Sequence, residues 1–135
     1  MPESFNVLIV DDEDDFRETL VKRFKKRNLN VFGAESGQTA LDLMNAHLFD
    51  VVILDVKMPG MNGLDTLREM KKKNPLMEVI LLTGHASMES GVEGMHLGAF
   101  DYVMKPVNID DLLEMIRQAY ERKLIHEENN RGRGH

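Results

Sequence analysis

Four apolar runs in the chain each end at polar residues of types that bind metal ions or phosphate groups. The runs and the polar residues that follow them are 7–10 with Asp11 and Asp12, 51–54 with Asp55, 79–82 with Thr83, and 102–104 with Lys105. As parallel strands of one sheet, these runs would share a carboxyl edge, which is where open α/β sheets bind their ligands. Three carboxylates, a hydroxyl and an ammonium would then converge, a set that suits a divalent cation together with a phosphoryl group.

The acidic run at residues 11–15 allows two interpretations. Acids are favoured at the N-terminus of a helix by its dipole, so the run could cap a helix that begins there. Five adjacent acids repel one another, however, and a cap needs no more than two of them. Adjacent carboxylates at the end of a strand suit a hard cation that prefers oxygen ligands. We therefore expect Asp11 and Asp12 to bind Mg²⁺.

Asp55, Thr83 and Lys105 each have a simpler explanation when considered alone. Turn formation explains Pro59 and Gly60, but it does not require a carboxylate at the end of a buried strand. An unpaired charge is costly there, so we expect a functional role for Asp55. Strand propensity would explain Thr83, and a solvated strand end would explain Lys105. A lysine opposite the acids is nevertheless expected to pair with them.

Composition narrows the possible classes of function. The chain has 135 residues, the length of one domain, and 42% of them are hydrophobic. A net charge of −6 argues against a direct nucleic-acid interface, which needs clustered Lys and Arg. The sequence has no signal-like N-terminus and no apolar run of about 20 residues, so we expect no membrane segment. With no cysteine, it fits a cytoplasmic protein.

The elements that must position these residues follow from the periodicity. The apolar runs are short and do not alternate with polar residues, which is typical of strands buried on both faces of a parallel sheet. A more polar run at 30–34 is the expected edge strand. Between the runs the apolar period becomes helical. The helical patterns are Phe16, Leu20 and Phe24; Ala40, Leu41 and Met44, capped by Ser36; Leu64, Leu67 and Met70; a weak helix at 87–97 that contains Gly91 and Gly94; and Ile109, Leu112, Leu113, Ile116 and Tyr120, capped by Asn108.

Strand and helix alternate five times along the chain. This alternation predicts an α/β fold with a doubly wound, five-stranded parallel sheet and right-handed crossovers. The strand order 2-1-3-4-5 of flavodoxin-like folds fits a chain of this length. We expect one domain over residues 4–124 and a polar tail over 125–135, either a frayed end or the start of a truncated linker.

Four longer motifs surround the candidate residues. They are VLIVDDE at 7–13, VVILDVKMPGMNGLD at 51–65, LLTGHA at 81–86 and GAFDYVMKP at 98–106. In this order and at this spacing they resemble the receiver domain of two-component response regulators, over about residues 4–124. The stretch from 81 to 106 is most similar to receivers of nitrogen-regulation-type activators of the alternative sigma factor.

The resemblance implies a role for each candidate residue. By this resemblance, Asp55 is the phosphoacceptor and part of the metal site, Asp12 binds Mg²⁺ directly, Asp11 binds it mostly through water, and the backbone carbonyl of Lys57 is the third protein ligand. The Thr83 hydroxyl would engage the phosphoryl group, and Lys105 would pair with it. Tyr102 would be the aromatic residue that rotates inward on activation. Lys57 and His85 occupy positions that tune the lifetime of the phosphoryl group.

The implied function is a Mg²⁺-dependent switch in a phosphorelay. A sensor histidine kinase or a phosphotransfer protein would supply the phosphoryl group, and the chain would catalyse only its own phosphorylation and dephosphorylation. The face formed by residues 84–104 would then bind a downstream output domain or protein. Formation of a homodimer on activation is a further expectation of the resemblance.

Two other functions use similar residues. A Mg²⁺-dependent phosphohydrolase with an aspartyl-phosphate intermediate would place its nucleophile in a DxD pair on the first strand and would need a substrate cap. Here the two acids are adjacent, and no segment for a cap is present. A flavodoxin-like binding or scaffold module would not need Thr83 and Lys105 together with three acids. Multiple turnover of a phosphate ester would distinguish the first alternative from a switch.

Overall fold

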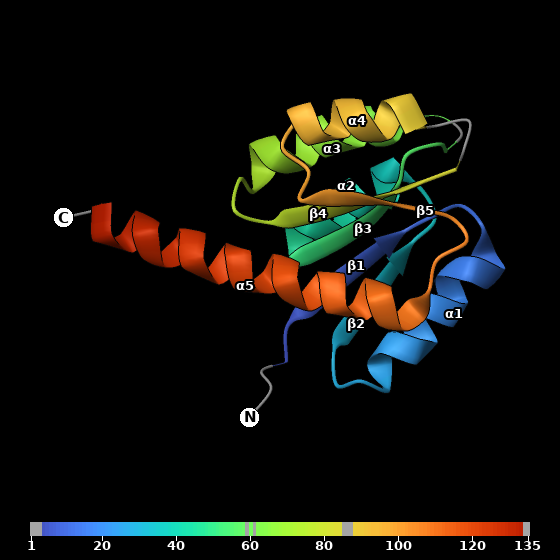
Figure 1. Ribbon diagram of the computed structural model, residues 1–135, viewed down its shortest axis with the longest axis horizontal. Coiled ribbons are helices and arrows are strands. Elements are labelled where there is room, and N and C mark those ends of the chain that lie inside the picture. Colours follow the sequence, from blue (N-terminus) through green and yellow to red (C-terminus); the bar gives the residue numbers. More distant parts are fainter. Residues whose placement is uncertain (1–3, 59, 61, 85–87, 134–135) are drawn as a thin grey trace.

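The computed structural model describes residues 4–58, 60, 62–84 and 88–133. Its centre is a parallel sheet with the strand order β2-β1-β3-β4-β5, which confirms the predicted order (Figure 1). The strands are β1 (Asn6–Val10), β2 (Asn30–Ala34), β3 (Val51–Asp55), β4 (Glu78–Thr83) and β5 (Asp101–Met104). The expected α/β class and its doubly wound topology are therefore present.

Burial within the sheet follows the apolar character of each strand. Strands β3 and β4 are buried at every residue, and β1 at all but its first residue. In β2, Asn30 and Gly33 are exposed, which confirms the prediction of an edge strand. The second edge is β5, whose four residues are each half-buried.

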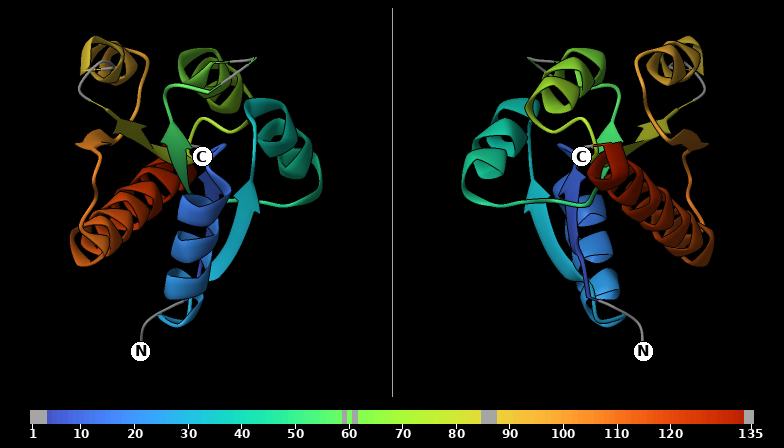
Figure 2. Two further views of the ribbon diagram at one scale, coloured as in Figure 1. Left: turned by 90° about the vertical axis from the view of Figure 1, so that its right-hand side faces the viewer. Right: turned by 90° about the vertical axis from the view of Figure 1, so that its left-hand side faces the viewer.

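Helices cover both faces of the sheet (Figure 2). They are α1 (Asp14–Lys25), α2 (Gly37–Ala46), α3 (Gly63–Lys73), α4 (Met88–His96) and α5 (Ile109–Arg133). One apolar cluster joins α1 and α5 to one face, through residues such as Leu20, Phe24 and Ile116. A second cluster joins α2 and α3 to the other face, where α4 also packs, through residues such as Leu41 and Met70.

Polar caps begin two helices, α2 and α5, as the sequence predicts. The Ser36 hydroxyl accepts a hydrogen bond from the Thr39 N–H at 3.1 Å at the start of α2. At the start of α5, the Asn108 side chain accepts one from the Asp111 N–H at 3.0 Å. Each cap satisfies a backbone donor that has no partner within its helix.

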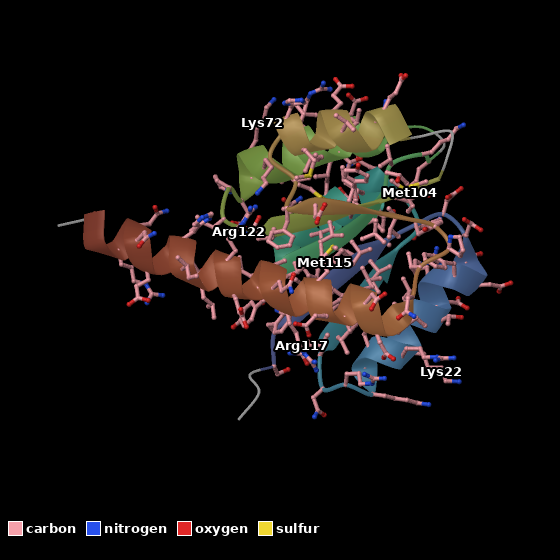
Figure 3. All side chains as sticks on the ribbon, viewed as in Figure 1. Lys22, Lys72, Met104, Met115, Arg117 and Arg122 are labelled. Atoms are coloured by element: carbon pink, nitrogen blue, oxygen red, sulfur yellow. The ribbon has the colours of Figure 1, made fainter. Side chains whose placement is uncertain are left out.

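The C-terminal segment differs from the expected frayed tail. Helix α5 continues to Arg133 and runs past the sheet (Figure 1). Ion pairs hold its middle to the amino edge of the sheet: Arg122 forks onto the buried carboxylate of Glu78, and Lys123 lies 2.8 Å from Asp50. Figure 3 shows Arg122 extending from α5 toward the sheet. Lys123 also pairs with Glu127 one turn later, at 2.9 Å, so the helix is supported where the apolar stripe ends.

The boundary between a domain at 4–124 and a following segment remains a prediction. None of the helices in the described part of the chain combines the length and the hydropathy needed to cross a bilayer.

Candidate functional site

The parallel register brings five of the predicted residues to one edge of the sheet: Asp11, Asp12, Asp55, Thr83 and Lys105. Val10 lies opposite Leu54, Asp55 opposite Leu82, and Thr83 opposite Met104. The residues that end or follow these strands are therefore neighbours. The N–H of Lys105 donates to the Thr83 carbonyl at 2.8 Å, which continues the ladder beyond β5. A cis peptide bond joins Lys105 to Pro106.

Three carboxylates converge at this edge. Asp11, Asp12 and Asp55 each offer one oxygen, and these oxygens all lie within 4.8 Å of one another. Asp11 is fully buried and Asp55 is 7% exposed, whereas Asp12 is exposed. One oxygen of Asp55 accepts a hydrogen bond from the Lys57 N–H at 3.2 Å. The sheet thus holds two of the acids in a partly dehydrated setting, where each repels the other.

Lys105 lies among these acids. Its ammonium is 2.9 Å from Asp11 Oδ2 and 3.8 Å from Asp55 Oδ2. It is also 2.9 Å from Glu13 Oε1 and lies 4.7 Å from the centroid of the Phe16 ring. The expected pairing of the lysine with the acids is present, but its shortest contacts are to Asp11 and Glu13.

Glu13 and Phe16 were not predicted as neighbours of Lys105. Glu13 is the N-cap of α1, yet its side chain makes no capping hydrogen bond and reaches Lys105 instead. Aspartate, asparagine, serine and threonine cap better than glutamate, so the residue type at this position was an available signal.

Burial and the neighbouring charges raise the pKa values of two groups at the site, Asp55 and Lys105. Burial, followed by the negative charge of Asp11, raises the pKa of Asp55 to about 6, against the opposing effect of Lys105. For Lys105, burial lowers the pKa, but contacts with Glu13 and Asp11 outweigh it and the pKa is raised. The Lys105 ammonium is therefore charged at neutral pH. The ionised form of Asp55 is disfavoured by burial and by repulsion from Asp11, and a bound cation would stabilise it.

Two buried oxygens at the site have no hydrogen-bond partner among the described residues: Asp11 Oδ2 and Thr83 Oγ1. Asp11 Oδ2 has the Lys105 ammonium beside it as an ion-pair partner. Thr83 is fully buried, and leaving a buried hydroxyl unpaired is costly, so such groups often mark a place where a ligand is received.

These groups fit a magnesium ion. The available donors are carboxylate oxygens, the ligands that Mg²⁺ prefers, and Lys105 offsets only part of their negative charge. Asp11, Asp12 and Asp55 are the side chains that would hold the ion.

The remaining predicted residues lie around this centre. Lys57 is adjacent through its N–H, and the metal-binding role of its carbonyl stays a prediction. Tyr102 is half-buried on β5, opposite Leu81, and packs against the apolar cluster under α2 and α3. His85 and Pro59 lie outside the described residues.

Comparisons with known proteins agree with this geometry. Residues 7–117 match the model of the response regulator receiver domain. The chain is 41% identical over 113 residues to the regulatory protein AtoC of Escherichia coli, which covers 84% of this chain and 24% of AtoC. It is 35% identical over 111 residues to the DNA-binding transcriptional regulator NtrC of Klebsiella pneumoniae, covering 82% of this chain and 24% of NtrC. The chain thus spans about a quarter of the length of these curated relatives.

Solved structures show the same fold. A response regulator receiver domain protein from Clostridium thermocellum superposes with a TM-score of 0.85 at 37% identity, covering 90% of this chain and 98% of that one. NtrX from Brucella abortus, solved with ADP, gives a TM-score of 0.90 at 28% identity, covering 95% of this chain and 30% of that one. Since the family model spans most of the chain and the acidic edge has the expected composition, the chain belongs to the response regulator receiver domains, the phosphorylation-activated switches of two-component systems.

Proposed function

We propose that Asp55 accepts a phosphoryl group from a phosphohistidine donor in a Mg²⁺-dependent reaction. The observation that carries this proposal is the placement of Asp55. Its carboxylate is almost fully buried, adjoins Asp11 and Asp12, and lies 3.8 Å from the Lys105 ammonium. Of the three acids, it is the buried one that lies next to strand β4, where the Thr83 hydroxyl has no hydrogen-bond partner among the described residues.

The chemistry follows from the charges. A carboxylate oxygen of Asp55 attacks phosphorus in line, the bond from phosphorus to the donor's imidazole nitrogen breaks, and the imidazole retains that electron pair. Bound Mg²⁺ would offset negative charge on the phosphoryl oxygens. Lys105, 3.8 Å from Asp55, would pair with a phosphoryl oxygen, and Thr83 would donate its hydroxyl proton to another. In this way the chain catalyses only its own phosphorylation and dephosphorylation.

The structural change that carries the signal would begin with the contact between Thr83 and the phosphoryl group. A phosphoryl group adds a charge of about −1.5 to −2 and three acceptor oxygens beside Thr83. As Thr83 moves to meet it, Tyr102 can enter the space released, and the face at 84–104 changes. Moving a switch from 1:99 to 99:1 needs about 5.5 kcal/mol of differential stabilisation, the order that a few charge-assisted hydrogen bonds supply.

The partners proposed are a histidine kinase or phosphotransfer protein as donor and an output domain or protein at the 84–104 face. An apolar groove of about 550 Å³ between α1 and the start of α5 supports a donor docking beside the site. Its lining includes Phe16, Leu20 and Val107, and it reaches Lys105. Relatives named as transcriptional regulators are about four times as long as the matched region, which fits an output domain in the same polypeptide.

A phosphohydrolase is not favoured, because the family found for the chain is a signalling switch. Intact-mass measurement after incubation with acetyl phosphate and Mg²⁺ tests the proposal. We expect a gain of about 80 Da, the mass of one phosphoryl group, in wild-type protein and none in Asp55→Asn. Labelling of Asp55→Asn at the wild-type rate would disprove the assignment, and repeated turnover of a phosphate ester would support the hydrolase instead.

A further inference from the structure

Helix α4 carries two buried glycines, Gly91 and Gly94, on the face that packs against the sheet. From the sequence, both are only weaknesses, because glycine destabilises a helix interior relative to alanine. In the structure each glycine lets the helix backbone come close to particular side chains of the sheet. The two positions do not face the same side chains, and this difference assigns them different roles.

Gly91 lies against the two residues of the proposed switch. A Cβ atom at this position would lie 3.1 Å from the Thr83 methyl carbon, 3.1 Å from Cδ2 of Tyr102 and 3.2 Å from its Cγ. These separations are shorter than ordinary van der Waals contact, so the neighbours would have to move by a few tenths of an ångström. Thr83 and Tyr102 therefore both rest against bare helix backbone at one point of α4.

Gly94, one turn along the same face, has other neighbours. A Cβ atom there would overlap Cδ1 of Leu81 and would lie 3.6 Å from Cδ2 of Leu64. Leu81 belongs to the buried apolar core, and Leu64 is partly buried against it. Substitution at Gly94 would thus disturb the packing of α4 without adding an atom against Thr83 or Tyr102.

We propose that Gly91 is a positioning residue for the switch: it gives Thr83 and Tyr102 a common contact with α4, through which their rearrangement displaces that helix. The inference rests on the proposed function, because it assumes that Thr83 and Tyr102 respond to a phosphoryl group. A methyl group at position 91 would press both side chains out of their present positions. It would therefore favour a state in which both side chains have moved away from this point of α4.

The test compares Gly91→Ala with Gly94→Ala, which lies on the same helix face and has the same gain in helix propensity. Beryllofluoride with Mg²⁺ serves as the phosphoryl probe. Tyrosine fluorescence reports on Tyr102 in a Tyr120→Phe background, since the chain has two tyrosines and no tryptophan. We expect Gly91→Ala to lower the Kd for beryllofluoride about threefold or more and Gly94→Ala to change it by less than about twofold.

A second readout needs no metal or probe. In ligand-free Gly91→Ala, the Tyr102 fluorescence should already be shifted toward that of liganded wild-type protein, and in Gly94→Ala it should not. A purely structural role for Gly91 would alter the melting temperature but leave this signal at its wild-type value.

Thr83→Ser provides the rescue, because it removes the methyl group that faces Gly91 and keeps the hydroxyl. If the contact is real, Gly91→Ala should change the Kd less in the Thr83→Ser background than in wild type. Should Gly91→Ala alone fail to fold, recovery of folding in the double variant would support the contact, and failure to recover would contradict it.

The possible failures are distinguishable. Absence of any response to beryllofluoride in wild-type protein would contradict the proposed function, and this inference with it. A normal wild-type response would overturn this inference alone if Gly91→Ala and Gly94→Ala behaved alike, or if Gly91→Ala weakened binding. An equal change in the Kd for beryllofluoride on Gly91→Ala in the wild-type and Thr83→Ser backgrounds would also overturn this inference alone.

Discussion

At the scale of single residues, the site consists of groups that the fold holds in unfavourable settings. Asp55 and Asp11 are carboxylates buried beside one another, and the Thr83 hydroxyl is buried with no hydrogen-bond partner in the described structure. Such costs are common at functional sites, because a ligand that relieves them binds more tightly. Lys105 offsets part of the negative charge, and it divides its contacts among Asp11, Glu13 and Asp55.

Asp55→Asn should stabilise the Mg²⁺-free protein. The pKa of Asp55 is raised to about 6 from the 3.8 that is usual for an aspartate, so the native state binds the proton more tightly than the unfolded state. Stability should therefore fall as the pH rises from about 4 to about 6 and the full penalty should apply above that. We expect the asparagine variant to be more stable by about 1–2 kcal/mol at pH 7.5.

Urea unfolding in the presence of a chelator, repeated from pH 4 to 8, measures this difference. Asp12→Asn is the matched control, because Asp12 is exposed and should change stability less. A wild-type protein more stable than Asp55→Asn at pH 7.5 would contradict the electrostatic account of the site.

Thr83→Val should separate stability from switching. Valine has nearly the shape of threonine, and the hydroxyl it replaces makes no hydrogen bond within the described residues. Thermal unfolding should therefore show little loss of stability, or a gain, whereas beryllofluoride binding with Mg²⁺ should weaken by about 1 kcal/mol or more. A marked loss of stability without ligand would mean that the hydroxyl already has a structural partner.

At the scale of secondary-structure elements, two helices make different contributions. Helix α5 is fixed to the amino edge of the sheet, remote from the acidic edge, by Arg122 on Glu78 and Lys123 on Asp50. Arg122 also lies 4.6 Å from the centroid of the Phe100 ring. Helix α4 is short and contains two glycines in close packing. The fold thus combines one firmly held helix with one that is intrinsically weak.

Arg122→Ala should destabilise the protein, because Glu78 is 1% exposed and would lose the cation that forks onto its carboxylate. Lys71 remains 3.8 Å away and compensates in part. We expect a loss of about 1–3 kcal/mol in denaturant unfolding, below the usual cost of breaking a fully buried pair. Arg117→Ala, at an exposed position on the same helix (Figure 3), should cost less than about 0.5 kcal/mol. Equal effects of the two substitutions would show that the Glu78 contact contributes nothing specific.

The elements differ in how well the sequence predicts them. The apolar runs predict the strands, because central strands of a parallel sheet are apolar on both faces. The strand order was predicted instead from the strand–helix alternation and the length of the chain. Helix α5 beyond residue 124 was not predicted, since its support comes from ion pairs to the sheet and within the helix rather than from an apolar stripe. The contacts of Lys105 with Glu13 and Phe16 were missed for a similar reason: they join α1 to the segment after β5, and no local pattern encodes them.

At the scale of the whole molecule, the domain places a charged edge and a weak helix on one sheet. The carboxyl edge collects the acids from β1 and β3 with Thr83 and Lys105 from β4 and β5, and α4 lies beside the last two strands. A change of charge at the edge can thus be converted into a change of packing at α4. With a net charge of −6, the molecule also repels anionic donors, and a bound divalent cation would reduce this repulsion at the acidic edge.

Millimolar Mg²⁺ should raise the melting temperature of the wild-type domain, because the ion binds the native cluster of acids and has no such site in the unfolded chain. The rise should be a few degrees, because a Mg²⁺ concentration about ten to a hundred times its Kd adds about 1.4–2.7 kcal/mol to the free energy of unfolding. Asp12→Ala should reduce the rise, and Asp65→Ala, an exposed acid on α3, should not. Identical Mg²⁺-dependent shifts in wild type and Asp12→Ala would exclude the acidic edge as the binding site.

The most direct test of the account is to locate the phosphoryl group chemically. An aspartyl phosphate is an acyl phosphate, which borohydride reduces to homoserine at the modified position. After incubation with acetyl phosphate and Mg²⁺ followed by borohydride, peptide mass spectrometry should find homoserine at residue 55 and an unchanged aspartate at positions 11 and 12. Homoserine at position 11 or 12 with intact Asp55, or no reduced residue in a protein that has gained the phosphoryl mass, would contradict the central claim.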